Sequence, residues 1–280
     1  MIRPFPNPPF LNLRRLPRRE RMTICIALRA SDGVVIAADA QESDRYYKRS
    51  QQKILPFISN PTMACAFTGA GDAGYLDAFF DYALKSIPVN ANHNELELFF
   101  ADKVKTFHEQ HLFPLALQVD PPSIDILIGV YASCHTYVFV SHGSTLRKAF
   151  PHSAVGAGAH FASGLIYELS DKIRDLRRTE LLAAYIIGMT KESIENCGKY
   201  TAIYSLHNSH AITTSEGSSQ LRAPSELITH VSPRTIHAWE ESFGTKWGPR
   251  QTELIDELIE EELGDSLSLQ LDSQTSAGRQ

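Results

Sequence analysis

The stretch from Thr23 to Asp39, T-I-C-I-A-L-R-A-S-D-G-V-V-I-A-A-D, constrains the fold of this chain more than any other. Residues 23–29 alternate in residue type as a strand does, and residues 34–38 are a run of β-branched and small apolar side chains. Ser31-Asp32-Gly33 between them has the residue types of a tight turn. The sequence therefore predicts a β-hairpin.

The hairpin predicts which residues lie side by side. Antiparallel partners around a tight turn have residue numbers with a nearly constant sum. A turn centred on Ser31-Asp32 thus puts Asp39 opposite position 23, 24 or 25, beside Thr23. Lys53 begins the next predicted strand after a polar loop, so its ammonium can return to the same end of the sheet.

A hydroxyl, a carboxylate and an amine at one place suit nucleophilic catalysis. A threonine hydroxyl is a poor nucleophile until a base takes its proton. An N-terminal α-amine, with a reference pKa of about 7.7 to 8.0, is suited to that task. An internal Thr23 carries an amide instead, so this chemistry requires Thr23 to become the first residue. We expect Lys53 to lower the pKa of the amine and the hydroxyl, and Asp39 to hold the lysine ammonium.

A glycine segment provides candidate donors for an oxyanion. Gly69-Ala70-Gly71 follows a predicted strand at residues 63–68 and is expected to form a turn, with Asp72 capping the helix that comes next. Glycine lets a substrate approach closely, and backbone N–H groups there can stabilise the negative charge of a tetrahedral intermediate.

The remaining periodic segments follow the order strands, helix pair, strands, helix pair, strands. Further strands are predicted at residues 53–57, 124–131, 136–140, 145–149 and 201–206, and further helices at residues 94–111, 160–174 and 179–196. Because the helices come in pairs between antiparallel strands, the sequence favours an α+β fold, a four-layer αββα sandwich of two antiparallel sheets between helical layers.

The ends of the chain differ from the middle. Residues 1–22 contain five Pro and six Arg and predict a flexible leader, which is either a propeptide or an extension upstream of a start at Met22. Residues 23–250 form the predicted catalytic domain. Residues 251–280 predict an amphipathic acidic helix followed by a disordered tail.

Composition excludes several classes of function. The net charge is −5, and the leader is basic, so the body of the chain is acidic and no nucleic-acid partner is expected. No apolar run approaches the roughly 20 residues of a membrane span, so no membrane partner is expected. The four cysteines are far apart, which disfavours a disulfide framework and predicts a cytoplasmic protein.

One histidine pair is a candidate for metal binding. His108-Glu109-Gln110-His111 places its histidines at i and i+3 and lacks the H-E-x-x-H spacing, so we read it as a feature of the helix surface. We expect no metal and no cofactor. Cys25, inside the first strand, is read as a buried core thiol.

Four segments together resemble a known family. T-I-C-I-A-L-R-A-S-D-G-V-V-I-A-A-D, K-I-L-P-F, A-C-A-F-T-G-A-G-D-A and S-A-V-G-A-G-A-H-F-A-S-G-L are similar to segments of the threonine peptidases of the proteasome β-subunit type. That group includes the bacterial heat-shock-locus peptidase and the ancestral β-subunit proteins. The match spans residues 23–206.

The resemblance implies the N-terminal nucleophile hydrolase fold and a threonine-type endopeptidase. It implies that Thr23 is the nucleophile and base, that Asp39 and Lys53 assist Thr23, and that Gly69 is the oxyanion donor. It also implies that Ser43 and Gly71 bind the substrate. It also implies a peptide or unfolded protein as substrate and a homo-oligomeric ring, and it leaves open an ATPase unfoldase as a partner.

Two departures from the family pattern keep alternatives open. Ala157, in Gly156-Ala157-Gly158, stands where the family has a serine, and residues 192–198 replace the usual aspartate, serine and glycines. The alternatives are a non-catalytic ring or scaffold subunit and a small-molecule amidase on the same fold.

Overall fold

The structure is a computed structural model. The residues it describes are 23–43, 48–50, 52–60, 62–88, 90–118, 121–149, 151–194, 197–198, 200–208, 211–213, 219–221 and 226–246. The predicted leader at 1–22 and the predicted helix and tail at 251–280 lie outside the described residues.

The opening hairpin forms the centre of the first antiparallel sheet. This five-stranded sheet has the order β10-β1-β2-β11-β14. Its strands are β1 (Ile24–Arg29), β2 (Gly33–Asp39), β10 (Ser153–Gly156), β11 (Thr201–His207) and β14 (Ile228–His230). Cys25 pairs with Ala38, so the observed register is the expected one.

The second antiparallel sheet also has five strands, in the order β5-β6-β7-β8-β9. They are β5 (Leu55–Asn60), β6 (Met63–Gly71), β7 (Ile124–Ala132), β8 (His135–His142) and β9 (Thr145–Lys148). Successive strands are neighbours throughout. Short connections join β5 to β6, β7 to β8 and β8 to β9, whereas residues 72–123 separate β6 from β7.

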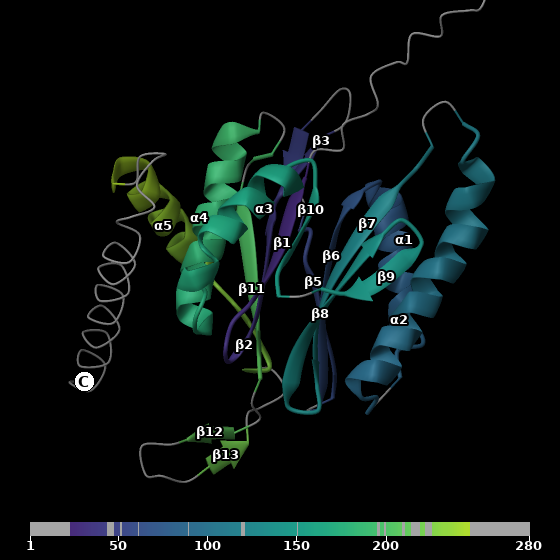
Figure 1. Ribbon diagram of the computed structural model, residues 1–280, viewed down its shortest axis with the longest axis horizontal. Helices are drawn as coiled ribbons and strands as arrows, with labels where there is room; N and C mark the ends of the chain where they lie inside the picture. The colour runs from purple at the N-terminus through teal and green to yellow at the C-terminus, as the bar shows by residue number, and fades with distance from the viewer. Residues whose placement is uncertain are drawn as a thin grey trace, which may run out of the picture.

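Helices cover the outer face of each sheet. The second sheet is covered by α1 (Ala73–Leu84) and α2 (His93–Phe107), and the first by α3 (Ala159–Glu168), α4 (Leu176–Ser193) and α5 (Pro233–Lys246). Figure 1 shows the four layers side by side, with α3, α4 and α5 on the left and α1 and α2 on the right. The predicted αββα sandwich is confirmed.

β1 is apolar on both faces because each face is buried in a different core. Ile24, Ile26 and Leu28 point into the core shared with α3 and α4, whereas Cys25 and Ala27 point into the core between the two sheets. A strand buried on both faces reads as a continuous apolar run. The small side chains of β1 on the inner face allow the two sheets to approach closely.

Shorter elements complete the described chain. Two additional two-stranded sheets pair β3 (Gln41–Ser43) with β4 (Lys48–Ser50), and β12 (Ala211–Thr213) with β13 (Ser219–Leu221). The short helical segments are η1 (His108–Leu112), η2 (Phe113–Leu115) and η3 (Ser170–Lys172).

The prediction that Gly69-Ala70-Gly71 forms a turn is wrong. Gly69 and Ala70 continue β6 and pair with Ile126 and Asp125 of β7, so the chain leaves the sheet only at Asp72. Asp72 does occupy the N-cap position of α1, but its side chain makes no capping hydrogen bond. Pairing with a long neighbouring strand outweighed the local preference of glycine for turns.

Other boundaries shifted where a local cap or a tertiary contact intervened. The helix predicted over 160–174 ends at Glu168, and α4 begins at Leu176 because the Asp175 carboxylate accepts a hydrogen bond from the Arg178 N–H. Lys53 precedes β5 rather than beginning it. Sequence periodicity did not predict β10, β14 or α5.

No helix in the described part of the chain is long and apolar enough to span a membrane.

Candidate active site

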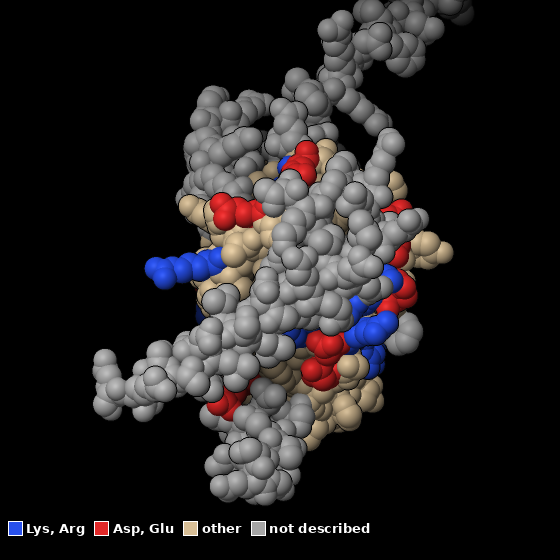
Figure 2. Space-filling model, turned by 90° about the vertical axis from the view of Figure 1, so that its left-hand side faces the viewer, with Lys and Arg blue, Asp and Glu red and all other residues tan. Residues whose placement is uncertain are grey.

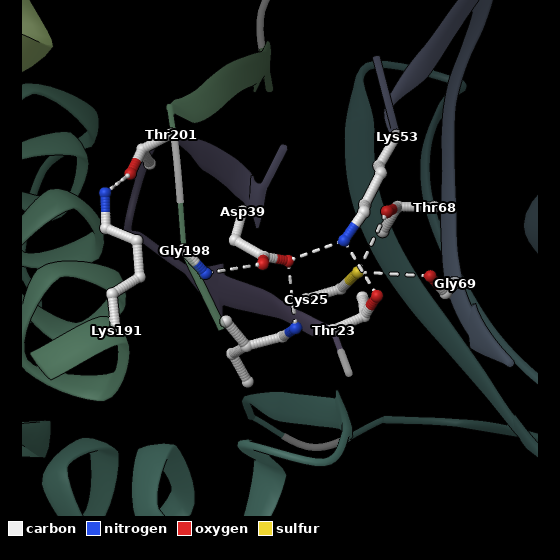
Figure 3. A network of polar contacts seen from close by, with 10 residues as sticks. Thr23, Cys25, Asp39, Lys53, Thr68, Gly69, Lys191, Gly198 and Thr201 are labelled. Carbon is white, nitrogen blue, oxygen red and sulfur yellow. Dashed lines mark hydrogen bonds and ion pairs between the residues drawn. The ribbon is translucent and has the colours of Figure 1, made fainter. Parts of the chain in front are cut away.

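Thr23, Asp39 and Lys53 converge at one end of the first sheet. Thr23 immediately precedes β1, Asp39 ends β2, and Lys53 reaches across from the segment before β5 of the other sheet. The Lys53 Nζ donates to Thr23 Oγ1 at 2.7 Å and to Asp39 Oδ1 at 2.8 Å. Figure 3 shows the lysine ammonium between the hydroxyl and the carboxylate.

Asp39 is a buried carboxylate with a full set of donors. Its side chain is 0% exposed, and it accepts hydrogen bonds from Lys53, from the Ile24 N–H at 3.1 Å and, through Oδ2, from the Gly198 N–H at 3.1 Å. Burial of a charge is tolerated when the charge is paired and hydrogen-bonded. The position of the carboxylate is therefore fixed from three sides.

The backbone of Thr23 is held by the segment between β10 and α3. The Gly158 N–H donates to the Thr23 carbonyl oxygen at 3.4 Å. A Cβ on Gly156 would lie 2.1 Å from that same oxygen, and Gly156 has a positive φ of 104°. Glycine is thus required here because another backbone, that of the candidate nucleophile, approaches closely. The sequence contains Gly156 and Gly158 but does not indicate that they contact the backbone of Thr23.

This contact leads to a prediction for Gly156→Ala. We expect the substitution to lower the free energy of unfolding by about 2–5 kcal/mol, because it adds a clash with Thr23 to an unfavourable φ. Gly143→Ala is the matched control, since Gly143 also has a positive φ, of 56°, but no heavy atom within 4 Å of the added Cβ. Urea unfolding of both variants measures the difference, and equal losses would contradict the role of the Thr23 contact.

Gly69 of β6 lies beside Cys25, two residues after Thr23. The N–H of Ile126, its partner on β7, donates to Ser141 Oγ on β8 at 2.8 Å and so points away from β6. In such a pair both backbones direct their polar groups outward, so the Gly69 N–H points away from β7. A Cβ on Gly69 would lie 2.6 Å from the Asp125 carbonyl oxygen, which explains the glycine.

Cys25 connects the two sheets beneath Thr23. Its Sγ donates to the Gly69 carbonyl oxygen at 3.3 Å and accepts from Thr68 Oγ1 at 3.2 Å. Burial raises the pKa of the Cys25 thiol to about 11, and burial likewise raises that of Cys197 to about 12. Both therefore stay protonated at neutral pH, and the interpretation of Cys25 as a buried core thiol is confirmed.

The remaining predicted residues are placed as follows. Ser43 ends β3 opposite Lys48 of β4, and its side chain lies outside the described part of the structure. Gly71 ends β6 with a φ of 123°, where a Cβ would lie 2.1 Å from the Ser123 carbonyl oxygen. The interpretation of the histidine pair as a feature of the helix surface is wrong for His108, which is buried, whereas His111 is exposed against the Phe107 ring.

Neither a metal cluster, among the described residues, nor a charged patch, among the described side chains on the face in Figure 2, stands out. Among the described residues, no group of three or more His, Cys, Asp or Glu side chains could hold a metal ion. On the face seen in Figure 2, the described acidic and basic side chains are interspersed.

The sequence did not indicate that Gly198 contacts the cluster. Gly198 follows α4 in the segment where the family pattern breaks down, and it supplies an N–H to Asp39. A glycine after a helix is ordinarily a helix terminator. No local signal distinguishes it from one that binds a carboxylate 159 residues away in the chain.

A four-layer αββα sandwich that gathers Thr23, Asp39 and Lys53 at the start of its first strand has the architecture of the N-terminal nucleophile hydrolases. The sequence model of the proteasome subunit family matches residues 20–198, and the chain belongs to this family. The resemblance seen in the sequence is confirmed. Among curated protein sequences, none matches the chain.

Solved structures with the same fold include several ancestral β-subunit proteins. Anbu from Yersinia bercovieri has a TM-score of 0.61 at 13% identity, covering 79% of this chain and 94% of that one. Anbu from Pseudomonas aeruginosa, solved as a helical assembly, has a TM-score of 0.55 at 14% identity, covering 82% and 99%. BPH from Thiobacillus denitrificans, in complex with epoxomicin, has a TM-score of 0.50 at 16% identity, covering 67% and 100%.

Proposed function

We propose that this chain is a threonine-type peptidase subunit that hydrolyses peptide bonds through an acyl-enzyme at Thr23. The observation that carries the proposal is the position of the Lys53 Nζ, 2.7 Å from Thr23 Oγ1 and 2.8 Å from Asp39 Oδ1. This is the geometry of a nucleophile whose hydroxyl is oriented and polarised by a fixed cation. Family membership supports the same activity.

The mechanism begins with attack of Thr23 Oγ1 on the carbonyl carbon of the substrate. The hydroxyl proton passes to the free α-amine of Thr23, which is a base of suitable strength at neutral pH. The C–N bond then breaks, the amine product leaves with a proton, and a threonyl ester remains. Water activated by the same α-amine hydrolyses that ester and restores the enzyme. Lys53 stabilises the oxygen as it loses its proton, and Asp39 holds Lys53 in place.

Gly69 is the proposed oxyanion donor. Its N–H points away from β7, toward the side from which Lys53 approaches. A backbone N–H fixed in a strand needs no reorganisation as negative charge develops, and such a donor typically contributes about 10²–10³ in rate. We place the peptide backbone of the substrate along Gly71 and Ser43, at the ends of β6 and β3.

The free amine of Thr23 requires the loss of residues 1–22. Met22 followed by the small Thr23 suits removal of an initiator methionine, so a natural start at Met22 is the simplest route. Self-cleavage of a propeptide is the other route.

One observation favours a second function, that of a non-catalytic ring or scaffold subunit. Ala157 lacks the hydroxyl that the family places beside the amine of the nucleophile, although its neighbours Gly156 and Gly158 still hold the Thr23 backbone. A subunit of this kind would assemble into the same homo-oligomer without hydrolysing substrate. A small-molecule amidase would hydrolyse a non-peptide amide instead.

Covalent labelling tests the proposal. Protein purified from its natural source is subjected to N-terminal sequencing and intact mass measurement, then incubated with a threonine-directed peptide probe; epoxomicin, present in the BPH complex, is a suitable compound. We expect chains that begin at Thr23 and carry the probe on Thr23. Chains that retain residues 1–22, or a probe attached elsewhere, would count against peptidase activity.

A further inference from the structure

The carboxylate of Glu240 binds two residues, Lys191 and Thr201, that lie on either side of Gly198 in the sequence. In the sequence Gly198 lies between Lys191, in the last turn of α4, and Thr201, the first residue of β11. Both side chains reach Glu240 on α5. The residues before and after Gly198 are therefore held by the same carboxylate.

The contacts at this point are short and shielded. The Lys191 Nζ lies 2.5 Å from Glu240 Oε1 and donates to Thr201 Oγ1 at 2.9 Å, while Thr201 Oγ1 donates to the same Glu240 oxygen at 2.5 Å. The side chains of Lys191 and Glu240 are 13% and 24% exposed, and Thr201 is 5% exposed. Charge-assisted hydrogen bonds of this length are among the stronger polar contacts in proteins.

Gly198 and Tyr200, between Lys191 and Thr201, contact Asp39 and the residue after it. The Gly198 N–H donates to Asp39 Oδ2, and the Ala40 N–H donates to the Tyr200 carbonyl oxygen at 2.7 Å. Thr201 lies opposite Asp39 in the pairing of β2 with β11. Figure 3 shows Lys191 and Thr201 on one side of Gly198 and Asp39 on the other.

We propose that Lys191, Thr201 and Glu240 are positioning residues that set the orientation of the Asp39 carboxylate through the Gly198 N–H, so that α5 is coupled to the candidate active site. Only the expected effect on catalysis rests on the proposed function. The structural link itself is independent of it. If the contacts of Glu240 with Lys191 and Thr201 are removed, the Gly198 N–H leaves Asp39 more often, and Lys53 loses its fixed anchor.

Matched variants separate the effect of the contacts between Lys191, Thr201 and Glu240 from an effect on the stability of the whole protein. Thr201→Val keeps the shape of the side chain but removes the hydroxyl, and Thr201→Ser keeps the hydroxyl. Glu240→Gln removes the charge. Glu241→Gln is the control on the same helix, because Glu241 is 71% exposed and pairs with His237 within α5.

The first readout is hydrogen exchange of the Gly198 amide, which needs no activity. We expect Glu240→Gln and Thr201→Val to accelerate this exchange about tenfold or more, and Thr201→Ser and Glu241→Gln to leave it within about twofold. Exchange at the unsubstituted rate in Glu240→Gln and Thr201→Val would overturn the proposal, whether or not the protein is a peptidase.

The second readout is the rate at which the threonine-directed peptide probe labels Thr23, corrected for the folded fraction. We expect a five- to tenfold slower rate for Glu240→Gln and Thr201→Val, a lower kcat with unchanged KM for a peptide substrate, and recovery in Thr201→Ser. If the unsubstituted protein is labelled but all variants are labelled at its rate, the coupling is overturned. If the unsubstituted protein is not labelled at all, the proposed function fails instead, and hydrogen exchange alone decides on the link.

Discussion

Thr23→Ala is expected to abolish peptide hydrolysis, with kcat reduced at least about a thousandfold, because the substitution removes the only atom that can form the acyl-enzyme in the proposed mechanism. Thr23 is half-buried, and its hydroxyl accepts one hydrogen bond from Lys53. The free energy of unfolding should therefore fall by only about 1 kcal/mol. Hydrolysis of a peptide library by protein expressed from Met22, followed by mass spectrometry, measures the effect.

Two further variants make this result specific. Thr23→Ser retains a hydroxyl on the first residue and should retain measurable hydrolysis. Thr145→Ala changes an exposed threonine on β9, remote from the cluster in sequence, and should leave hydrolysis unchanged. Equal hydrolysis by Thr23→Ala and the unsubstituted protein would reject the mechanism, and assembly without hydrolysis in the unsubstituted protein would favour a scaffold subunit.

Lys53→Met should have the largest effect on stability. It leaves the Asp39 carboxylate 0% exposed, with neutral N–H donors in place of a cation. Removal of one partner of a buried ion pair typically costs about 3–5 kcal/mol, since the other charge stays uncompensated. For a domain of this size that loss lowers Tm by roughly 10 °C. We also expect loss of hydrolysis, because nothing else in the described site polarises Thr23 Oγ1.

A double substitution separates the two effects. Lys53→Met combined with Asp39→Asn removes both charges, so part of the lost stability should return while hydrolysis stays absent. Lys105→Met is the matched control: Lys105 is 67% exposed and lies 3.9 Å from Glu109, and an exposed pair of this kind contributes at most about 0.5 kcal/mol. A loss for Lys53→Met no greater than for Lys105→Met would show that Lys53 does not compensate the buried carboxylate.

The sequence predicted the two sheets and the register of the first hairpin because both follow from local rules. β1 is buried on both faces, so alternation with a period of two determines which of the two cores each side chain enters, and a tight turn fixes the pairing that brings Asp39 beside Thr23. The errors fall where a residue's environment is supplied from elsewhere in the chain. Gly69 was assigned to a turn from its own preference, whereas pairing with β7 keeps it in a strand.

The sequence by itself therefore determined the αββα class, which follows from the order of strands and helix pairs along the chain, and the candidate nucleophile with the carboxylate beside it, which depend on neighbours within one hairpin. The sequence indicated Lys53 as their partner, but only the tertiary structure decided that Lys53 bridges Thr23 and Asp39, since that contact depends on how the two sheets face each other. It also decided that Gly198 anchors Asp39 and that Gly156 makes room for Thr23. Such contacts join segments far apart in the chain, and packing of the whole sandwich, rather than local backbone preference, sets their distances.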